Sequence, residues 1–224
     1  MKKEILTMVM TFALAMSSCD KEVTLVFSSD DITVDLGGTN KELLKYVQSS
    51  DGSEVTVSGV NFDKVGSYQA LFTSGDLKET RTVKVRADKL AGTYAWNMYG
   101  LERDGTYFRL TENEWYWDFT KGNEYNNLLI PDSVLSPYSN QKERLFGNAG
   151  VLTLQMDGDS ISITPWCGKL LFMLSSKPID YSFDSIRYGR LPNGDYGIIS
   201  FRMIGKEGKY TNYYRFDFEK QGAE

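Results

Sequence analysis

Aromatic and amide side chains are mixed between residues 116 and 166, and this mixture suits the recognition of sugars. Sugar rings present apolar faces that stack on flat aromatic rings, while their hydroxyl groups bond to Asn, Gln and Arg side chains. The opposing interpretation is that any one of these rings simply fills a domain interior. The candidate ligand-binding residues are Tyr116, Tyr125, Asn126, Asn127, Tyr138, Gln141, Arg144 and Trp166.

Catalytic chemistry has less support. The chain has no histidine, which excludes histidine metal sites and Ser-His-Asp or Cys-His catalysis. A glycosidase needs two carboxylates about 5–10 Å apart, but solvation explains the pair Glu112 and Glu114, and turn formation explains Asp157 and Asp159. With no histidine to activate it, Cys167 is interpreted as a small packed hydrophobe. We therefore predict that the protein is not an enzyme and holds no cofactor.

Cation and nucleic-acid binding are also disfavoured. The segment from Met156 to Ser160 is not an EF-hand loop, because the spaced oxygen ligands and the terminal Glu do not follow. The formal net charge is −5, and no basic stripe that would neutralise phosphates is present. We predict no metal site and no nucleic-acid partner.

The candidate residues must be positioned by strands, because the chain shows period-two alternation and no sustained helical periodicity. Between residues 31 and 87 short alternating strands are separated by turns such as Gly37-Gly38 and Asp51-Gly52. Ahead of the strand that begins at Tyr68, Asp63 and Gly66 give the spacing of a tyrosine corner. Tyr68 as an ordinary core aromatic remains the alternative.

On these residues, the segment resembles the bacterial Ig-like modules that follow the lipid anchor in surface lipoproteins of Bacteroides-type bacteria. The resemblance implies a small β-sandwich that serves as a spacer or platform. The cysteine pair of many Ig domains is absent.

Residues 88–224 contain all four tryptophans and a second set of alternating segments. Leu90-Ala91-Gly92-Thr93-Tyr94-Ala95-Trp96 resembles the opening strand of lipocalin-like antiparallel β-domains. Explicit turn signals at 157–159 and 193–195 separate later strands. The chain is thus predicted to be all-β, with a small Ig-like sandwich followed by an antiparallel β-barrel or β-sandwich.

Two finer predictions concern this second part. Alternation from Trp115 to Phe119 predicts that Trp115, Trp117 and Phe119 face the core, while Tyr116 faces outward. In the same way, Phe216 is predicted to be buried, which leaves Tyr213 and Arg215 on the wet face of their strand. No alternation is visible from residue 121 to 149, so a long loop is expected there, and loops of that length are often lids or binding loops.

The first residues are typical of export. Lys2 and Lys3 precede an uncharged run that is too short to span a membrane, and Met16-Ser17-Ser18-Cys19 resembles a lipobox. The resemblance implies that residues 1–18 are a signal peptide, that Cys19 carries lipid, and that 19–30 form an anchored linker. An ordinary secretory signal with an incidental cysteine is the alternative. Because Cys167 is the only other cysteine, no intrachain disulfide is expected after lipidation.

Together these features predict a lipoprotein of the outer membrane, held at the cell surface through Cys19. The order of an Ig-like module and a β-rich domain resembles Bacteroides-type lipoproteins that accompany polysaccharide uptake. That resemblance implies a glycan-binding module whose partners are polysaccharide or proteins of an uptake complex. The competing hypothesis is a structural or adhesive envelope protein that binds another protein.

Overall fold

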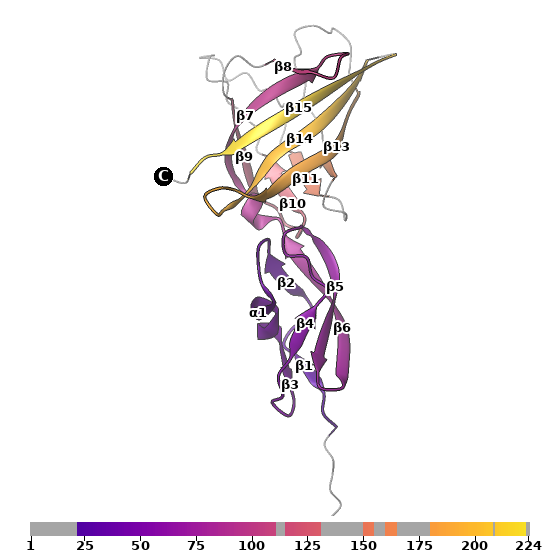
Figure 1. Ribbon diagram of the computed structural model, residues 1–224, viewed down its shortest axis with the longest axis vertical. Coiled ribbons are helices and arrows are strands. Elements are labelled where there is room, and N and C mark those ends of the chain that lie inside the picture. Colours follow the sequence, from indigo (N-terminus) through magenta and orange to yellow (C-terminus); the bar gives the residue numbers. More distant parts are fainter. Residues whose placement is uncertain are drawn as a thin grey trace, which may run out of the picture.

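The computed structural model describes residues 22–110, 115–130, 150–154, 160–164, 180–207 and 209–222. Its strands form a small N-terminal sandwich followed by a nearly closed antiparallel barrel, stacked end to end along the long axis (Figure 1). The all-β prediction is confirmed, and the second part is a barrel. Cys19 and the signal segment lie outside the described residues.

The N-terminal sandwich consists of two sheets. In the larger sheet, β2 pairs in parallel with β6, and β5 and β4 follow in antiparallel order, while β1 pairs with β3. Alternate residues such as Val34, Phe72 and Val85 are buried between the sheets. The elements are β1 Leu25–Phe27, β2 Ile32–Asp35, α1 Asn40–Leu43, η1 Leu44–Tyr46, β3 Val47–Ser49, β4 Thr56–Ser58, β5 Gly66–Ser74 and β6 Leu77–Arg86.

The tyrosine corner expected in this sandwich is present. The hydroxyl of Tyr68 donates a hydrogen bond to the carbonyl oxygen of Lys64 at 2.9 Å. Tyr94 makes the same kind of contact in the barrel, where its hydroxyl donates to the carbonyl oxygen of Leu90 at 2.7 Å and accepts from the amide of Ile198 at 3.2 Å. Burial raises the pKa of the Tyr94 hydroxyl. Each tyrosine therefore fixes the chain that leads into its strand.

The barrel sheet runs in the order β12-β11-β10-β9-β7-β15-β14-β13, and β8 pairs with the far end of β7. The short helical turn η2 Asp88–Leu90 connects it to the sandwich. Among the described residues, no helix is long and apolar enough to cross a membrane. The strands are β7 Gly92–Leu101, β8 Tyr107–Arg109, β9 Trp115–Lys121, β10 Asn127–Ile130, β11 Gly150–Leu154, β12 Ile161–Thr164, β13 Asp180–Arg190, β14 Tyr196–Glu207 and β15 Tyr210–Lys220.

The expectation of a strandless segment from residue 121 to 149 is wrong at its beginning. Strand β9 continues to Lys121, and β10 pairs with both β9 and β11. In β10, Leu128 and Ile130 are buried, but Leu129 between them is also apolar. The sequence of this strand therefore shows no alternation of polar and apolar residues. Residues 131–149 lie outside the described part of the chain.

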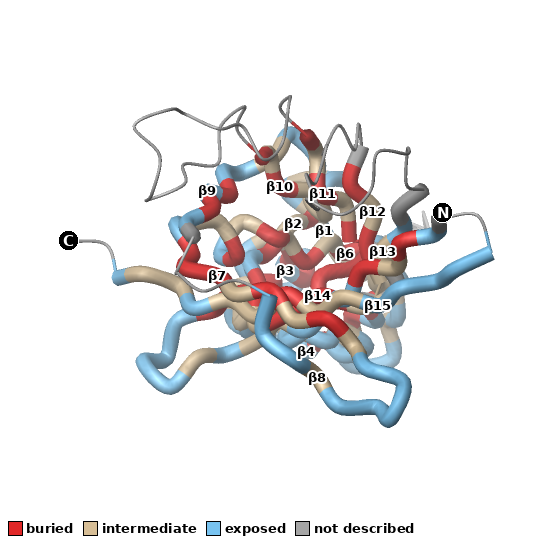
Figure 2. Tube along the Cα trace, turned by 90° about the horizontal axis from the view of Figure 1, so that it is seen from above, coloured by how far each residue is buried: buried red, intermediate tan, exposed pale blue. Residues whose placement is uncertain are grey.

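The barrel interior is filled by aromatic rings. Trp117 is 1% exposed and packs on Phe119 with ring centroids 5.1 Å apart, and Phe201 packs on Phe216 at 4.9 Å. The predicted faces of β9 are confirmed for Trp117, Phe119 and the exposed Tyr116. Seen along the long axis, buried and exposed positions alternate around the barrel wall (Figure 2). The side chain of Trp115 is not among those described.

Two barrel tyrosines join the barrel to the sandwich. The Tyr196 hydroxyl donates to Oδ1 of Asp63 at 2.7 Å, and the Tyr188 hydroxyl accepts from the amide of Val65 at 3.0 Å. The bond to Asp63 raises the pKa of Tyr196. Gly37 lies so close that a Cβ placed on it would be 2.3 Å from the Tyr196 ring. The two parts are therefore docked through specific contacts.

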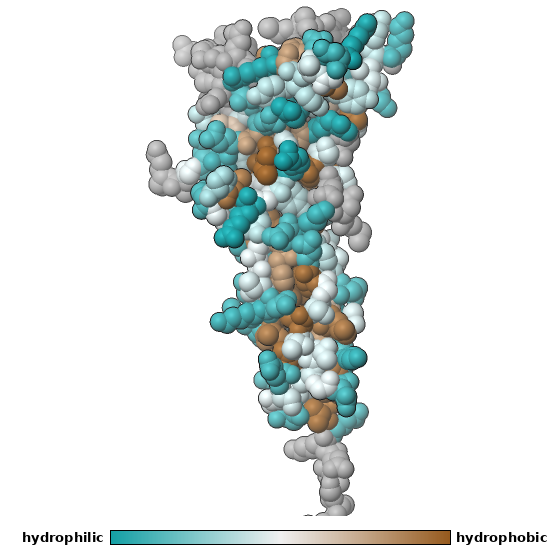
Figure 3. All heavy atoms as spheres, viewed as in Figure 1, coloured by the Kyte–Doolittle hydropathy of each residue, from teal (hydrophilic) through white to brown (hydrophobic). Residues whose placement is uncertain are grey.

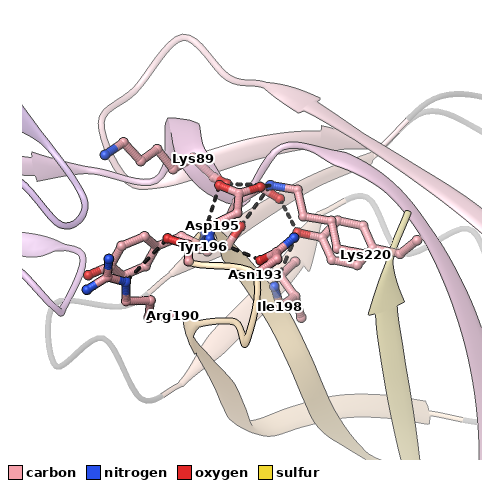
Figure 4. A network of polar contacts seen from close by, with 10 residues as sticks. Lys89, Arg190, Asn193, Asp195, Tyr196, Ile198 and Lys220 are labelled. Carbon is pink, nitrogen blue, oxygen red and sulfur yellow. Dashed lines mark hydrogen bonds and ion pairs between the residues drawn. The ribbon is translucent and has the colours of Figure 1, made fainter. Parts of the chain in front are cut away.

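A lysine near the C-terminus strengthens this junction. Nζ of Lys220 donates to the carbonyl oxygens of Lys89 and Tyr196 at 2.9 and 2.8 Å, and it pairs with Oδ2 of Asp195 at 2.9 Å (Figure 4). This contact lowers the pKa of Asp195. The end of β15, the η2 connector and the β13–β14 turn are thereby held together at the base of the barrel.

Candidate functional site

The predicted site residues do not form one cluster. Tyr116 is 42% exposed on the outer face of β9. Tyr125 lies instead at the sandwich end of the barrel, where its carbonyl oxygen accepts a hydrogen bond from the amide of Ala87 at 2.7 Å. Tyr138, Gln141, Arg144 and Trp166 lie outside the described residues.

Asn126 and Asn127 use their amide groups within the chain. Nδ2 of Asn126 donates to the carbonyl oxygen of Leu154 at 2.7 Å, which ties the β9–β10 turn to β11. Oδ1 of Asn127 accepts from the amide of Glu124 at 3.1 Å and closes that turn. Both side chains therefore have an evident structural role. Whether either also contacts a ligand stays a prediction.

The outer face of the barrel around Tyr116 offers a better-defined site. Strand β7 places Trp96 and Met98 inward, so Ala95, Asn97 and Tyr99 point outward. Hydrophilic side chains cover much of the barrel surface in Figure 3. We call the outward positions of β8, β9, β7, β15 and β14 the outer face.

A depression of about 220 Å³ lies on the outer face, lined by Ala95, Asn97, Asp217, Phe218 and Glu219. Ala95 stands directly opposite Tyr116 on one side and Glu219 on the other. Residues directly opposite one another in antiparallel strands project from the same face with Cβ atoms about 5 Å apart. The small side chain of Ala95 thus leaves a gap with a tyrosine ring on one side and carboxylates on the other.

The polar groups of this depression are held in place by their neighbours. The guanidinium of Arg109 donates from Nη2 to Oδ1 of Asn97. Arg215 contacts both carboxylate oxygens of Asp217, at 2.9 Å from Nε and 3.0 Å from Nη2. Such charge-assisted contacts fix side-chain orientation. The depression therefore presents acceptors in a defined geometry.

The guanidinium of Arg215 is in turn stacked between two rings. Its Cζ lies 4.9 Å from the ring centroid of Tyr99 and 4.4 Å from that of Tyr107. Both distances are within the range of cation–π contacts. The stack makes this part of the outer face stiff, and it explains Tyr99 as a structural partner of Arg215.

A second depression, of about 330 Å³, lies on the N-terminal sandwich between β2 and the α1–η1 segment. Its lining mixes Asp35 and Glu42 with Lys45 and Arg86, so neither sign of charge is favoured. The Tyr46 hydroxyl, which could serve a ligand, donates to the carbonyl oxygen of Thr33 at 3.2 Å. This depression is the weaker candidate.

No family model, curated protein or solved structure matches the chain. Among the described residues, no group of three Cys, Asp or Glu side chains is placed to hold a metal ion. What the outer face offers is hydrogen bonding and ring stacking.

Sequence reasoning identified only Tyr116 of this site. Alternation also places Tyr213 and Arg215 on the wet face of β15, and the structure agrees, with Tyr213 36% exposed. Which residues stand beside Tyr116 depends on strand order, and β7 lies between β9 and β15 although β15 is far along the chain. Asn97, Asp217 and Glu219 carried no signal in the sequence that could have grouped them.

Proposed function

We propose that this protein is a lipid-anchored protein of the outer membrane that binds glycans at the outer face of its barrel. The observation that carries the proposal is the depression over Ala95, bordered by Tyr116 and lined by Asn97, Asp217 and Glu219. The proposal assigns binding without catalysis. It includes attachment through Cys19 and exposure at the cell surface, which rest on the residues around the lipobox.

The chemistry of the depression suits a sugar ring. Carboxylate and amide oxygens accept hydrogen bonds from hydroxyl groups, and the exposed ring of Tyr116 offers a flat face for the apolar side of a pyranose. Asn97 and Asp217 are oriented by Arg109 and Arg215 before a ligand arrives. Such preorganisation reduces the entropy lost on binding.

The arrangement of the two parts suits a surface receptor. Strand β1, which follows the anchored segment in sequence, lies at the end of the sandwich far from the barrel (Figure 1). The sandwich therefore separates the outer face from the proposed membrane anchor. The contacts of Tyr188, Tyr196 and Lys220 hold the barrel in one orientation on that support.

Calorimetric titration of residues 20–224 against plant, host and microbial polysaccharides, both neutral and acidic, tests the binding. This fragment retains every described element. We expect one class of polysaccharide to bind, and Tyr116→Ala to weaken binding about tenfold, as loss of an aromatic contact at a binding centre does. Tyr210→Ala is the matched control, because Tyr210 is 62% exposed at the β14–β15 hairpin, away from the depression. Silence across the panel would reject the proposal.

Surface exposure needs its own test. Protease treatment of intact cells should digest the barrel if the protein is anchored on the outer face, whereas complete protection until the cells are lysed would argue against that location. Replacement of Cys19 by Ser should release the protein from the membrane fraction. Retention of the Cys19→Ser protein would contradict lipid anchoring.

One observation favours the competing function, a protein partner. Phe108 and Leu110, in and after β8, are 44% and 37% exposed although both are large and apolar. Exposed apolar groups of this kind mark protein contacts when they form a patch. If Phe108→Ser abolishes attachment of a cellular protein while no glycan binds, the protein-binding function is the better account.

A further inference from the structure

The depression on the outer face exists because Ala95 is small. Ala95 points outward between Tyr116 on β9 and Glu219 on β15, yet its exposed fraction is only 4%. The larger side chains around it therefore rise above it, and its methyl group lies at the base of the depression of about 220 Å³. A larger side chain at this position would fill that space.

The base of the depression is narrow. Residues directly opposite one another in antiparallel strands have Cβ atoms about 5 Å apart, so about 10 Å separates the Cβ atoms of Tyr116 and Glu219 across Ala95. Non-bonded carbon atoms approach one another to about 3.5 Å, which leaves about 3 Å for the width of a group between the two walls. That width is about two covalent bonds. One substituent of a sugar fits there, whereas a whole ring lying across the strands does not.

The chemistry at the base suits a substituent with an apolar carbon and a polar end. The methyl group of Ala95 offers an apolar contact, and the exposed Glu219 and the half-buried Asp217 offer carboxylates that accept a hydrogen bond from a hydroxyl group. Asp217 keeps this capacity although it pairs with Arg215, because a carboxylate has about four acceptor positions. The exocyclic hydroxymethyl group of a hexopyranose, one CH₂ that carries one hydroxyl, has this composition.

Other sugar substituents match the base less well. A hydroxyl group on the ring brings no CH₂ group to meet Ala95. An acetamido group is branched and is wider than the base. The carboxylate of a uronate would face the carboxylates of Asp217 and Glu219, and like charges at close range repel. The hydroxymethyl group is therefore the substituent that meets all three constraints.

We propose that Ala95 is the specificity-determining residue of this site, and that the depression above it takes the hydroxymethyl group of a hexopyranose whose ring stacks on Tyr116. This inference rests on the proposed glycan function and specifies the ligand as a neutral hexose polysaccharide. A pentopyranose such as xylose has no hydroxymethyl group, so it leaves the base empty and gives the carboxylates no hydroxyl donor there. A site built to bond a substrate hydroxyl discriminates against the analogue that lacks it.

The test uses the full chain purified in detergent and oligosaccharides of matched length. Calorimetric titrations compare hexamers of glucose, mannose, galactose and xylose. Cellohexaose and xylohexaose share their linkage and ring configuration and differ only in the hydroxymethyl group. At least one hexose hexamer should bind about tenfold more tightly than xylohexaose.

A substitution of Ala95 tests the cause of this preference. Ala95→Val fills the base with methyl groups and introduces a residue that strands favour. It should weaken hexose binding about tenfold, to the level of xylohexaose, and change xylohexaose binding less than twofold. Thr120→Ile is the matched control, because it adds volume at an exposed position of β9 four residues, or about 13 Å, from Tyr116. This control should change no affinity more than twofold.

A second variant keeps the test decisive if circular dichroism shows that the Ala95→Val protein does not fold. Glu219→Ala lies at an exposed position and removes a hydroxyl acceptor from the base. It should also lower the ratio of hexose affinity to xylose affinity.

The outcomes separate the two proposals. If xylohexaose binds as tightly as the hexose hexamers, or if the folded variant keeps the tenfold preference, the hydroxymethyl subsite is rejected and glycan binding stands. If no hexamer binds while another polysaccharide of the plant, host and microbial panel does, the hexose specificity is rejected and glycan binding again stands. If the whole panel is silent, both proposals are rejected.

Discussion

Replacing Gly37 by Ala should destabilise the protein through the junction between sandwich and barrel. Gly37 has a φ of +73°, and an added Cβ would lie 2.3 Å from Cε2 of Tyr196. The Tyr196 ring, which is 7% exposed, would have to move, and its hydroxyl bond to Asp63 would be lost. Gly52 is a matched control, because its φ is +81° and nothing lies within 4 Å of its Cβ position.

The expected loss in the free energy of unfolding has two contributions, backbone strain and the lost hydrogen bond of Tyr196. A residue with a Cβ in the left-handed region costs about 1–2 kcal/mol, which applies to Gly37→Ala and Gly52→Ala alike. Loss of the Tyr196 bond to the exposed carboxylate of Asp63 adds about 1.5 kcal/mol, the lower end for a charged partner. We therefore expect a loss of about 3 kcal/mol for Gly37→Ala. Tyr196→Phe should cost only the hydrogen bond.

Urea unfolding followed by circular dichroism measures the difference. With a slope of about 2 kcal/mol per molar urea, the midpoint should fall by about 1.5 M for Gly37→Ala and by less than about 1 M for Gly52→Ala. Equal shifts for the two glycine variants would refute the reasoning, because the junction would then contribute nothing beyond backbone strain. An unchanged midpoint for Tyr196→Phe would refute the hydrogen-bond contribution.

Two further predictions concern other parts of the molecule. Trp117→Ala, which empties the middle of the aromatic core, should lower the free energy of unfolding by about 3–5 kcal/mol in the same urea titration. Hydrogen bonds from Ser49 and Ser53 lower the pKa of Asp51 to about 2, so this carboxylate stabilises the fold above its unfolded pKa of about 3.9 and ceases to do so as the pH falls through 2. The melting temperature should therefore fall between about pH 4 and pH 2, and Asp51→Asn should flatten that part of the profile.

Local patterns predicted much of the fold. Alternation identified the faces of β9, and the spacing from Asp63 to Tyr68 predicted the tyrosine corner that the bond to Lys64 confirms. Both features depend on residues close together in sequence. Strand β10 was not predicted, because its four residues show no polar–apolar alternation: Leu129 is apolar and stands between the buried Leu128 and Ile130.

The site could be predicted only in part, because it is assembled across strands. Tyr116, Ala95 and Glu219 become neighbours through the β9-β7-β15 order, which no local pattern encodes. Tyr188 and Tyr196 stand beside turn residues in the sequence, a position typical of exposed tyrosines, yet the structure uses both in the junction. Residues beside turns can meet another part of the chain as readily as a ligand.

The central claim, that the outer face binds a glycan, is tested most directly by mapping a bound oligosaccharide onto the protein. Amide chemical shifts of residues 20–224 would be recorded during titration with the oligosaccharide of highest affinity. The account predicts that the perturbed amides cluster around Ala95, Asn97, Tyr116, Asp217 and Glu219, and that Tyr116→Ala shifts the titration midpoint to about tenfold higher ligand concentration. Perturbations centred elsewhere on the protein, or none at millimolar ligand, would contradict it.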